Sequence, residues 1–265
     1  MKKVRLDQLV FDQGLSESRE RAKAIIMSGV VYVNGQRADK PGAQVAPDVN
    51  IEVRGNTLPY VSRGGLKLEK AIAAFGLTFE GKTCMDVGSS TGGFTDCMLQ
   101  KGAQKVYAVD VGYGLLDWKL RNGPRVVVME RTNARLLNPE MTGGERMDFA
   151  SMDVSFISIR TVLPAVRTCM KENAHLAVLV KPQFEARREQ VGKGGIVRDP
   201  KVHREVLETV IAAMPAIGLM PQGLTISPIK GVGGNTEFLL HLTNTELNDA
   251  AFQAERAIED VLRFV

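Results

Sequence analysis

The feature that most constrains the fold is a regular alternation of short β-rich runs with helical segments, which begins near residue 61. The β-rich runs cover residues 83–87, 106–109, 126–128, 149–154, 176–180, 223–227 and 238–242. Helical patterns fit around them, at residues 66–76, 158–172, 202–213 and 246–263. Strands that alternate with helices form a mostly parallel sheet with helices on both faces. We therefore predict an α/β fold with a seven-stranded sheet over residues 59–265.

The first 53 residues have a different organisation. Apolar spacing over residues 6–10 predicts a short helix, and Ser16 can cap a second helix that ends at Gly29. Residues 30–33 form a β-rich run closed by Asn34-Gly35, a dipeptide typical of hairpins. Residues 54–60 contain glycine, asparagine and proline, which is typical of a linker. We predict a small α+β domain with its linker over residues 1–58.

The composition excludes several classes of protein. Hydrophobic residues make up 44% and charged residues 24% of the 265 residues, which is ordinary for a globular chain. Three cysteines without metal or redox spacing indicate a reducing compartment and no metal site. The longest apolar stretch, residues 210–220, is interrupted by Pro215, and no signal-peptide core follows the N-terminus. We expect a cytoplasmic protein without a membrane segment.

The richest local motif runs from Asp86 to Phe94, where a glycine-rich turn follows the first strand of the sheet and opens a helix. Glycines in such a turn let the backbone approach a ligand closely. Asp110 ends the next strand, where a carboxylate can accept hydrogen bonds from ribose hydroxyls. The glycine spacing departs from both the dinucleotide fingerprint and the nucleotide-triphosphate loop. The loop and Asp110 together favour binding of an adenosyl group.

Four charged residues fall at the ends of predicted elements. They are Lys67 in the first helix of the α/β region, Asp153 and Lys181 after the fourth and fifth strands, and Glu237 before the last strand. The carboxyl ends of the strands form the ligand crevice of an open α/β sheet. A single strand-end charge is most simply a solvating group. Four of them in the order Lys, Asp, Lys, Glu resemble the FtsJ-type ribose 2′-O-methyltransferases.

Residues 3–53 carry a second resemblance. Arg-Leu-Asp, Ser-Arg-Glu-Arg-Ala-Lys, Gly-Val-Val-Tyr-Val-Asn-Gly and Lys-Pro-Gly occur in the order seen in the S-four RNA-binding module. Charge alone favours a solvent-exposed helix face, because residues 1–60 have a net charge of only +2. The resemblance instead implies binding of structured RNA. The basic residues that we assign to it are Arg5, Arg19, Arg21, Lys23, Arg37 and Lys40.

With both resemblances in one chain, the sequence is similar to the TlyA family, often labelled hemolysin A. The segments that carry the similarity are residues 62–67, 86–96, 152–158, 180–185 and 233–238. The similarity implies a Rossmann-like domain that transfers a methyl group from S-adenosylmethionine (SAM) to cytidine ribose hydroxyls of ribosomal RNA. It implies catalytic roles for Lys67, Asp153, Lys181 and Glu237. The cofactor contacts that we expect are Asp86, Gly88, Ser89, Ser90, Gly92, Gly93, Phe94, Asp110, Asn133 and Asp153.

Methyl transfer to a hydroxyl requires that the hydroxyl be positioned and its proton removed. We expect Lys181 nearest the hydroxyl, Asp153 between Lys181 and the cofactor, and Lys67 and Glu237 as orienting partners. Lys67 could lower the pKa of Lys181 and make it a general base. In the alternative, both lysines stay charged and stabilise a developing alkoxide.

Other features are less specific. Trp118 and Phe184 could stack on a base, and the basic run between Arg187 and Arg204 suits either RNA contact or a solvated loop. Two other functions compete: a membrane-lytic protein, as the hemolysin label implies, and a non-catalytic RNA-binding assembly factor. The sequence lacks a suitable membrane segment and retains all four charged residues. We expect a monomer that acts on ribosomal RNA or a ribosomal subunit.

Overall fold

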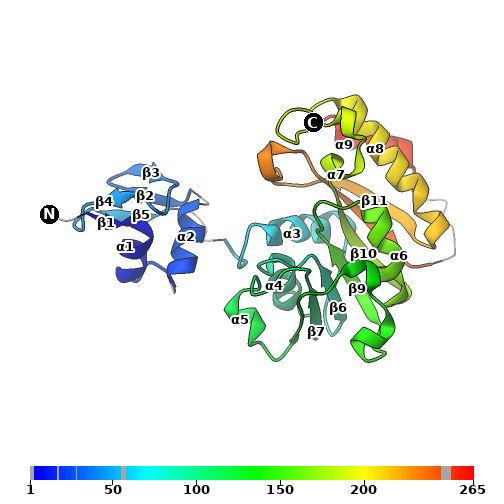
Figure 1. Cartoon of the computed structure of the whole chain (residues 1–265), viewed down its shortest axis with the longest axis horizontal. Coiled ribbons are helices and arrows are strands. Elements are labelled where there is room, and N and C mark those ends of the chain that lie inside the picture. Colours follow the sequence, from blue (N-terminus) through cyan, green and yellow to red (C-terminus); the bar gives the residue numbers. More distant parts are fainter. Residues whose placement is uncertain (1–2, 17, 28, 55–57, 246–251) are drawn as a thin grey trace. The chain divides into compact units, whose positions relative to one another are not determined.

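The computed structural model describes residues 3–16, 18–27, 29–54, 58–245 and 252–265 (Figure 1). The chain divides into two compact units, residues 1–63 and 64–265. The boundary predicted from the sequence lies after residue 58.

The N-terminal unit packs two helices on short antiparallel strands. The two helices, α1 (Leu6–Asp12) and α2 (Arg19–Met27), contact each other. One sheet has the strand order β3-β2-β5 and consists of β2 (Val31–Val33), β3 (Gln36–Ala38) and β5 (Ile51–Val53). A second, two-stranded sheet pairs β1 (Val4–Arg5) with β4 (Gln44–Val45). The hairpin turn at Asn34-Gly35 has positive φ at both residues, as the sequence predicts. The expected cap at Ser16 is wrong: the Ser18 hydroxyl accepts from the Arg21 amide at 3.1 Å, and α2 begins at Arg19.

The C-terminal unit is built on the predicted seven-stranded sheet. Its strands are β6 (Thr83–Val87), β7 (Lys105–Val109), β8 (Val126–Met129), β9 (Met147–Met152), β10 (Met170–Val180), β11 (Met220–Ile226) and β12 (Phe238–Thr243). They lie in the order β11-β12-β10-β9-β6-β7-β8. The sheet is parallel except that β12 is antiparallel to both of its neighbours. The predicted mostly parallel sheet is confirmed.

Helices cover both faces of this sheet (Figure 1). The longer ones are α3 (Gly64–Phe75), α4 (Gly93–Gln100), α6 (Ile159–Thr168), α8 (Pro200–Ala213) and α9 (Ala254–Leu262), and the short ones are α5 (Trp118–Arg121) and α7 (Pro182–Glu185). Single 3₁₀ turns lie at residues 134–136, 139–142, 188–190, 215–217 and 232–234. Helices α6, α8 and α9 share one large apolar core with the sheet, whereas α3 and α4 pack on each other at the opposite face.

Two predicted helices differ from the structure. The predicted helix 158–172 ends at Thr168, because Met170 already pairs with Met147 of the neighbouring strand β9. Of the predicted helix 246–263, residues 246–251 lie outside the described residues, and α9 begins at Ala254. Within the described ranges, each helix is too short or too polar to span a lipid bilayer.

The order of the strands determines where a ligand can bind. Strand β6 has β7 on one side and β9 on the other, because the chain runs outward from β6 through β7 to β8 and then returns past β6 to form β9. This is the switch point at which open α/β sheets bind their ligands, beyond the carboxyl ends of the strands. The glycine-rich turn, Asp110, Asp153 and Lys181 all follow strands at this edge.

Candidate active site

The structure brings the four predicted catalytic side chains into one cluster of ion pairs and hydrogen bonds. Asp153 lies between the two lysines: its Oδ2 accepts from Lys67 Nζ at 3.1 Å, and its Oδ1 is 2.6 Å from Lys181 Nζ. Lys67 Nζ also donates to Glu237 Oε2 at 2.8 Å. Four elements distant in sequence supply these groups: the first turn of α3, the ends of β9 and β10, and the residue before β12.

The cluster is buried and its formal charges balance. Lys67 and Lys181 are each 8% exposed and Glu237 is 3% exposed, whereas the side chain of Asp153 keeps 20% of its surface accessible. Burial opposes the charged form of Lys67, but the carboxylates of Asp153 and Glu237 outweigh it and raise the pKa of Lys67 above its ordinary value. Lys67 therefore carries its charge at neutral pH, and Asp153 offsets that charge next to Lys181.

Lys181 has a further partner that the sequence analysis missed. Its Nζ donates to the Ser155 hydroxyl at 2.8 Å, two residues beyond Asp153. An ammonium group has three donor positions; the Ser155 hydroxyl engages one of them, and Asp153 pairs with the charge. Lys181 therefore connects Asp153 with Ser155, which lies in the exposed loop that follows β9.

The loop after Asp153 also presents an exposed aromatic side chain. Phe156 is 91% exposed, has a positive φ of 63°, and its ring centroid lies 5.0 Å from that of Phe184. A positive φ is strained for a bulky residue, and strain of this kind clusters at functional sites. The sequence contained the Ser-Phe pair, but neither its exposure nor its backbone conformation follows from local pattern.

Asp86 lies beneath the glycine-rich turn and holds it in place. Its carboxylate is 1% exposed and accepts hydrogen bonds from the Thr95 amide at 2.9 Å, the Thr95 hydroxyl at 2.7 Å and the Ser151 hydroxyl at 3.0 Å. Burial raises the pKa of Asp86 to about 6 against the effect of these bonds. Asp86, which we expected to contact the cofactor, connects β6 to α4 and β9 from inside the unit.

The turn itself is shaped by its glycines. Gly88 has φ +83°, and a Cβ there would lie 2.6 Å from the Asp153 carbonyl oxygen, so the turn touches the backbone of the strand end that carries Asp153. Gly92, at φ +95°, lies against the side chains of Leu116 and Leu120. Any side chain at either glycine would separate the turn from its neighbours.

Asp110 connects this turn to the next strand end. Its Oδ2 accepts from the Ser90 amide at 2.8 Å and its Oδ1 from the Gly112 amide at 2.7 Å. Ser89 is buried, and its amide donates to the Val109 carbonyl at 3.0 Å. A carboxylate has about four lone-pair positions, so Asp110 retains capacity for two further donors.

The remaining predicted cofactor contacts have other surroundings. Gly93 is buried as the first residue of α4, and Phe94 is 4% exposed. Asn133 is half-buried, and its side-chain oxygen accepts from the Arg135 amide at 3.1 Å, which caps a 3₁₀ turn. Phe94 therefore acts as a core residue in this structure, and Asn133 as a cap.

Among the predicted RNA-binding residues, Arg5 and Arg19 converge on one carboxylate. Asp7 is fully buried, and its oxygens accept from Arg5 at 2.8 and 3.0 Å and from Arg19 at 3.4 Å. The Arg5 hydrogen bonds hold the pKa of Asp7 down at about 2. Both arginines keep at least 40% of their side-chain surface exposed.

The other four basic residues of the N-terminal unit differ among themselves. Arg21 donates to the backbone carbonyls of Tyr60 at 3.0 Å and Leu58 at 2.6 Å, so it holds the linker. Lys23 lies 3.8 Å from Glu20 on the same helix. Arg37 and Lys40 are exposed.

The basic run after α7 is fastened to the segment that carries Glu237. The Asn235 side chain accepts from the Val197 amide at 3.0 Å and donates to the Gly195 carbonyl at 2.9 Å. Asn235 is 3% exposed and stands two residues before Glu237. Gly195 and Val197 of this run therefore contact the segment that leads into Glu237.

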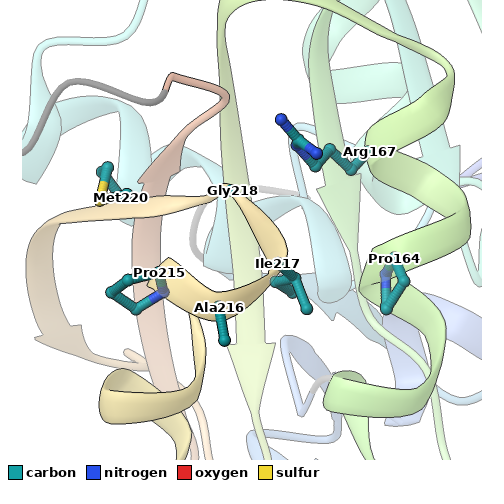
Figure 2. A pocket seen from close by; sticks show the side chains of 7 residues that line it. All are labelled: Pro164, Arg167, Pro215, Ala216, Ile217, Gly218 and Met220. Atoms are coloured by element: carbon teal, nitrogen blue, oxygen red, sulfur yellow. The ribbon is translucent and has the colours of Figure 1, made fainter.

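A separate pocket lies at the other edge of the sheet (Figure 2). Pro164 and Arg167 of α6 line it together with residues 215–218 and Met220. Met220 begins β11 and pairs with Thr243 at the end of antiparallel β12, which places the pocket near the amino ends of the parallel strands. Arg167 is engaged there by the Asn244 side chain at 2.9 Å. In the described part of the chain, no group of three or more His, Cys, Asp or Glu side chains is arranged to hold a metal ion.

Comparison with known proteins identifies both units. The model of the FtsJ-like methyltransferase family matches residues 60–244, and that of the S4 domain matches residues 4–51. The 16S/23S rRNA (cytidine-2′-O)-methyltransferase TlyA of Mycobacterium tuberculosis is 42% identical, over 98% of this chain and 96% of its own length. The chain belongs to the TlyA family of FtsJ-like methyltransferases.

Further TlyA-like proteins extend the similarity. A candidate rRNA methyltransferase of Bacillus subtilis, YqxC, is 56% identical over 91% of this chain and 86% of its own length. A solved structure described as a candidate hemolysin from Streptococcus thermophilus superimposes with a TM-score of 0.78 at 47% identity, covering 99% of this chain and 97% of that one. The hemolysin label and the methyltransferase label thus occur among relatives of one chain.

Proposed function

We propose that this TlyA-family protein transfers a methyl group from SAM to the ribose 2′-hydroxyl of a cytidine in ribosomal RNA. The observation that carries the proposal is the buried, charge-balanced cluster of Lys67, Asp153, Lys181 and Glu237 at the carboxyl edge of the sheet. The name of the M. tuberculosis relative supplies the nucleotide and the type of RNA.

The residues of the glycine-rich turn fit an adenosyl cofactor. Asp110 has two lone-pair positions left for a ribose diol, and Ser90 beside it is exposed. Gly88 brings the turn against the backbone of Asp153, so a ligand held by the turn is adjacent to the catalytic cluster. When bound, SAM supplies a methyl group already activated on a sulfonium.

Lys181 is the residue that we place at the reacting hydroxyl. Asp153 and Ser155 hold its ammonium group, while Lys67 is engaged by two carboxylates and serves to fix Asp153 and Glu237. A neutral Lys181 would accept the hydroxyl proton as a general base, whereas a charged one would stabilise the developing alkoxide. Exposed Phe156 next to Ser155 offers an aromatic face for the base of the target nucleotide.

RNA affinity would come from the N-terminal S4 domain. Arg5 and Arg19 present half-exposed guanidinium groups aligned by one buried carboxylate, a suitable arrangement for phosphate contacts. Arg21 is occupied by the linker carbonyls and would contribute less. Ribosomal RNA as the substrate would place the enzyme in the cytoplasm.

The decisive experiment measures transfer of labelled methyl from SAM to ribosomal RNA and to isolated ribosomal subunits. Lys181→Ala should lose nearly all turnover while SAM affinity stays within a few-fold, because Lys181 acts on the group whose charge changes in the transition state. Lys171→Ala is the matched control, since Lys171 is also paired with an aspartate, Asp148, at 2.7 Å but near the amino end of its strand. Full activity of Lys181→Ala would show that the site is wrongly assigned.

Lys181→Arg separates the two roles of the lysine. A guanidinium stays charged and has a different shape, so we expect this variant to fail; a largely active variant would exclude general-base action and support electrostatic stabilisation. Tight RNA binding by the wild-type protein without methyl transfer would favour the non-catalytic assembly factor. Lysis of erythrocytes by purified protein, unchanged in Lys181→Ala, would favour the lytic function that the hemolysin label implies.

A further inference from the structure

The loops that carry Asp153 and Lys181 are joined at a second place, beyond the catalytic cluster. The loop after β9 contains Ser155 and Phe156 and leads into α6 at Ile159. The segment after Lys181 forms α7, which ends at Glu185. Glu185 Oε2 accepts from the Ser158 hydroxyl at 2.7 Å, and Oε1 accepts from the Ile159 amide at 2.7 Å.

The carboxylate of Glu185 is buried although it lies outside the cluster. Its side chain is 1% exposed, and burial raises the pKa of Glu185 in spite of the hydrogen bonds it accepts. Arg160, 3.4 Å away and 39% exposed, is its nearest cation. Burying a carboxylate costs free energy, so we attribute the buried position of Glu185 to the hydrogen bonds that it accepts.

These contacts hold the exposed loop after β9 at its start, its middle and its end. Lys181 holds the start of the loop through Asp153 and Ser155, Phe184 contacts Phe156 in the middle, and Glu185 holds the end at Ser158. A residue at positive φ, such as Phe156, persists only where its surroundings restrain it on both sides. Glu185 supplies the restraint on the C-terminal side.

We propose that Glu185 is a positioning residue for methyl transfer, which fixes Ser155 and Phe156 relative to Lys181. The inference rests on the proposed function, because it concerns how the same site orders its substrate-facing loop. Glu185 itself does not touch the reacting atoms. Replacing Glu185 should leave the glycine-rich turn, here called the cofactor turn, intact, because Asp86, Gly88 and Asp110 are held by other contacts.

Glutamine offers a conservative rescue at this position. Its amide oxygen can accept from the Ile159 amide, and its NH₂ group can donate to the Ser158 hydroxyl, which accepts as readily as it donates. Glu185→Gln should therefore retain most of the activity, whereas Glu185→Ala should lower kcat with RNA about 10- to 100-fold, the scale of a misplaced reacting group. SAM affinity should change less than twofold in both variants.

A matched control separates positioning from general stability. Glu145 is likewise a carboxylate that accepts several hydrogen bonds, from Thr83 at 3.2 Å, Lys105 at 2.8 Å and Tyr107 at 2.6 Å, but its side chain is 35% exposed and it lies at the amino ends of β6 and β7. Glu145→Ala should lower Tm without lowering kcat when activity is measured well below both melting temperatures. An equal loss of kcat in Glu145→Ala and Glu185→Ala would reduce Glu185 to a structural role and overturn the proposal.

A double-mutant cycle tests the route through the loop. If Glu185 acts by holding Phe156, then Glu185→Ala should cost much less activity in a Phe156→Ala background than in the wild type. Additive losses would contradict this coupling, as would full activity of Glu185→Ala. An inactive wild-type protein would refute the proposed function instead, so the two failures are distinguishable.

Discussion

Replacing Lys67 with methionine should destabilise the C-terminal unit by about 3–5 kcal/mol, the usual cost of removing one partner from a buried ion pair. Lys67 pairs with Glu237, which is 3% exposed, and with Asp153, so the substitution leaves a buried carboxylate without its cation. Methionine keeps the apolar stem of the side chain and lacks only the ammonium group, so the effect reports mainly the charge. A loss of this size is a large part of the 5–15 kcal/mol that holds a typical domain together.

Urea unfolding followed by circular dichroism measures this loss, and two further variants show its origin. Lys67→Met combined with Glu237→Gln should be more stable than Lys67→Met alone, because the second change removes the uncompensated charge. Lys181→Met should cost less, since Asp153 keeps its bond to Lys67 and part of its access to water.

The pH dependence gives an independent check of the same interaction. The pKa of Lys67 is raised in the folded protein, so its stabilising contribution is complete below the unfolded pKa of about 10.5 and is lost as pH rises through the folded pKa. On the alkaline side of neutral pH, the difference between wild type and Lys67→Met should therefore shrink as pH rises through that range. A Lys67→Met protein within 1 kcal/mol of wild type at neutral pH, with additive double mutants, would refute the reasoning.

Three other perturbations follow from single contacts. The pKa of His241 is lowered to about 4 by burial, so wild-type stability should fall by up to about 3 kcal/mol between pH 6.5 and pH 4, and His241→Gln should flatten that slope in pH-dependent unfolding. Asp7→Asn should cost the N-terminal unit about 1–2 kcal/mol at neutral pH, allowing for solvent screening of its half-exposed arginines, and the cost should vanish as pH falls through about 2. Gly88→Ala should cost about 1–3 kcal/mol by calorimetry and weaken SAM binding, because its Cβ would displace the Asp153 carbonyl.

The sheet could be predicted from the sequence because its signal is local. Each buried strand is a short apolar run between turn residues, and alternation with helices implies parallel pairing. The end of α6 could not be predicted in this way: helical periodicity continues past Thr168, and pairing of Met170 with Met147 decides the outcome from another strand. Likewise, Ser16 and Ser18 are equivalent as caps in sequence, and only Ser18 faces the first turn of α2.

The site shows the same division between local and distant information. Lys67, Asp153, Lys181 and Glu237 stand at element ends, so topology alone places them at one edge of the sheet. Their pairing depends on which carboxylate oxygen contacts which ammonium group, and the spacing of residues in the sequence does not predict this. Asp86 has the local setting of a ligand contact, yet Thr95 and Ser151 draw its carboxylate inward. Glu185 lacks any local signal, because the groups it binds lie 26 and 27 residues away.

Asp153 connects every part of the proposed reaction. Its backbone carbonyl touches Gly88 of the cofactor turn, its carboxylate joins both lysines, and the loop that follows carries Ser155 and Phe156. A displacement of this one strand end would therefore change the cofactor turn, the charged cluster and the substrate-facing loop together. This explains why the chain fixes the strand end from three directions, with a glycine at the turn, a buried salt bridge to α3, and the Glu185 contacts at the far end of the loop. Variants at Gly88, Lys67 and Glu185 should consequently share a loss of turnover, and the Gly88 variant, whose substitution acts on the glycine-rich turn directly, should lower SAM affinity most.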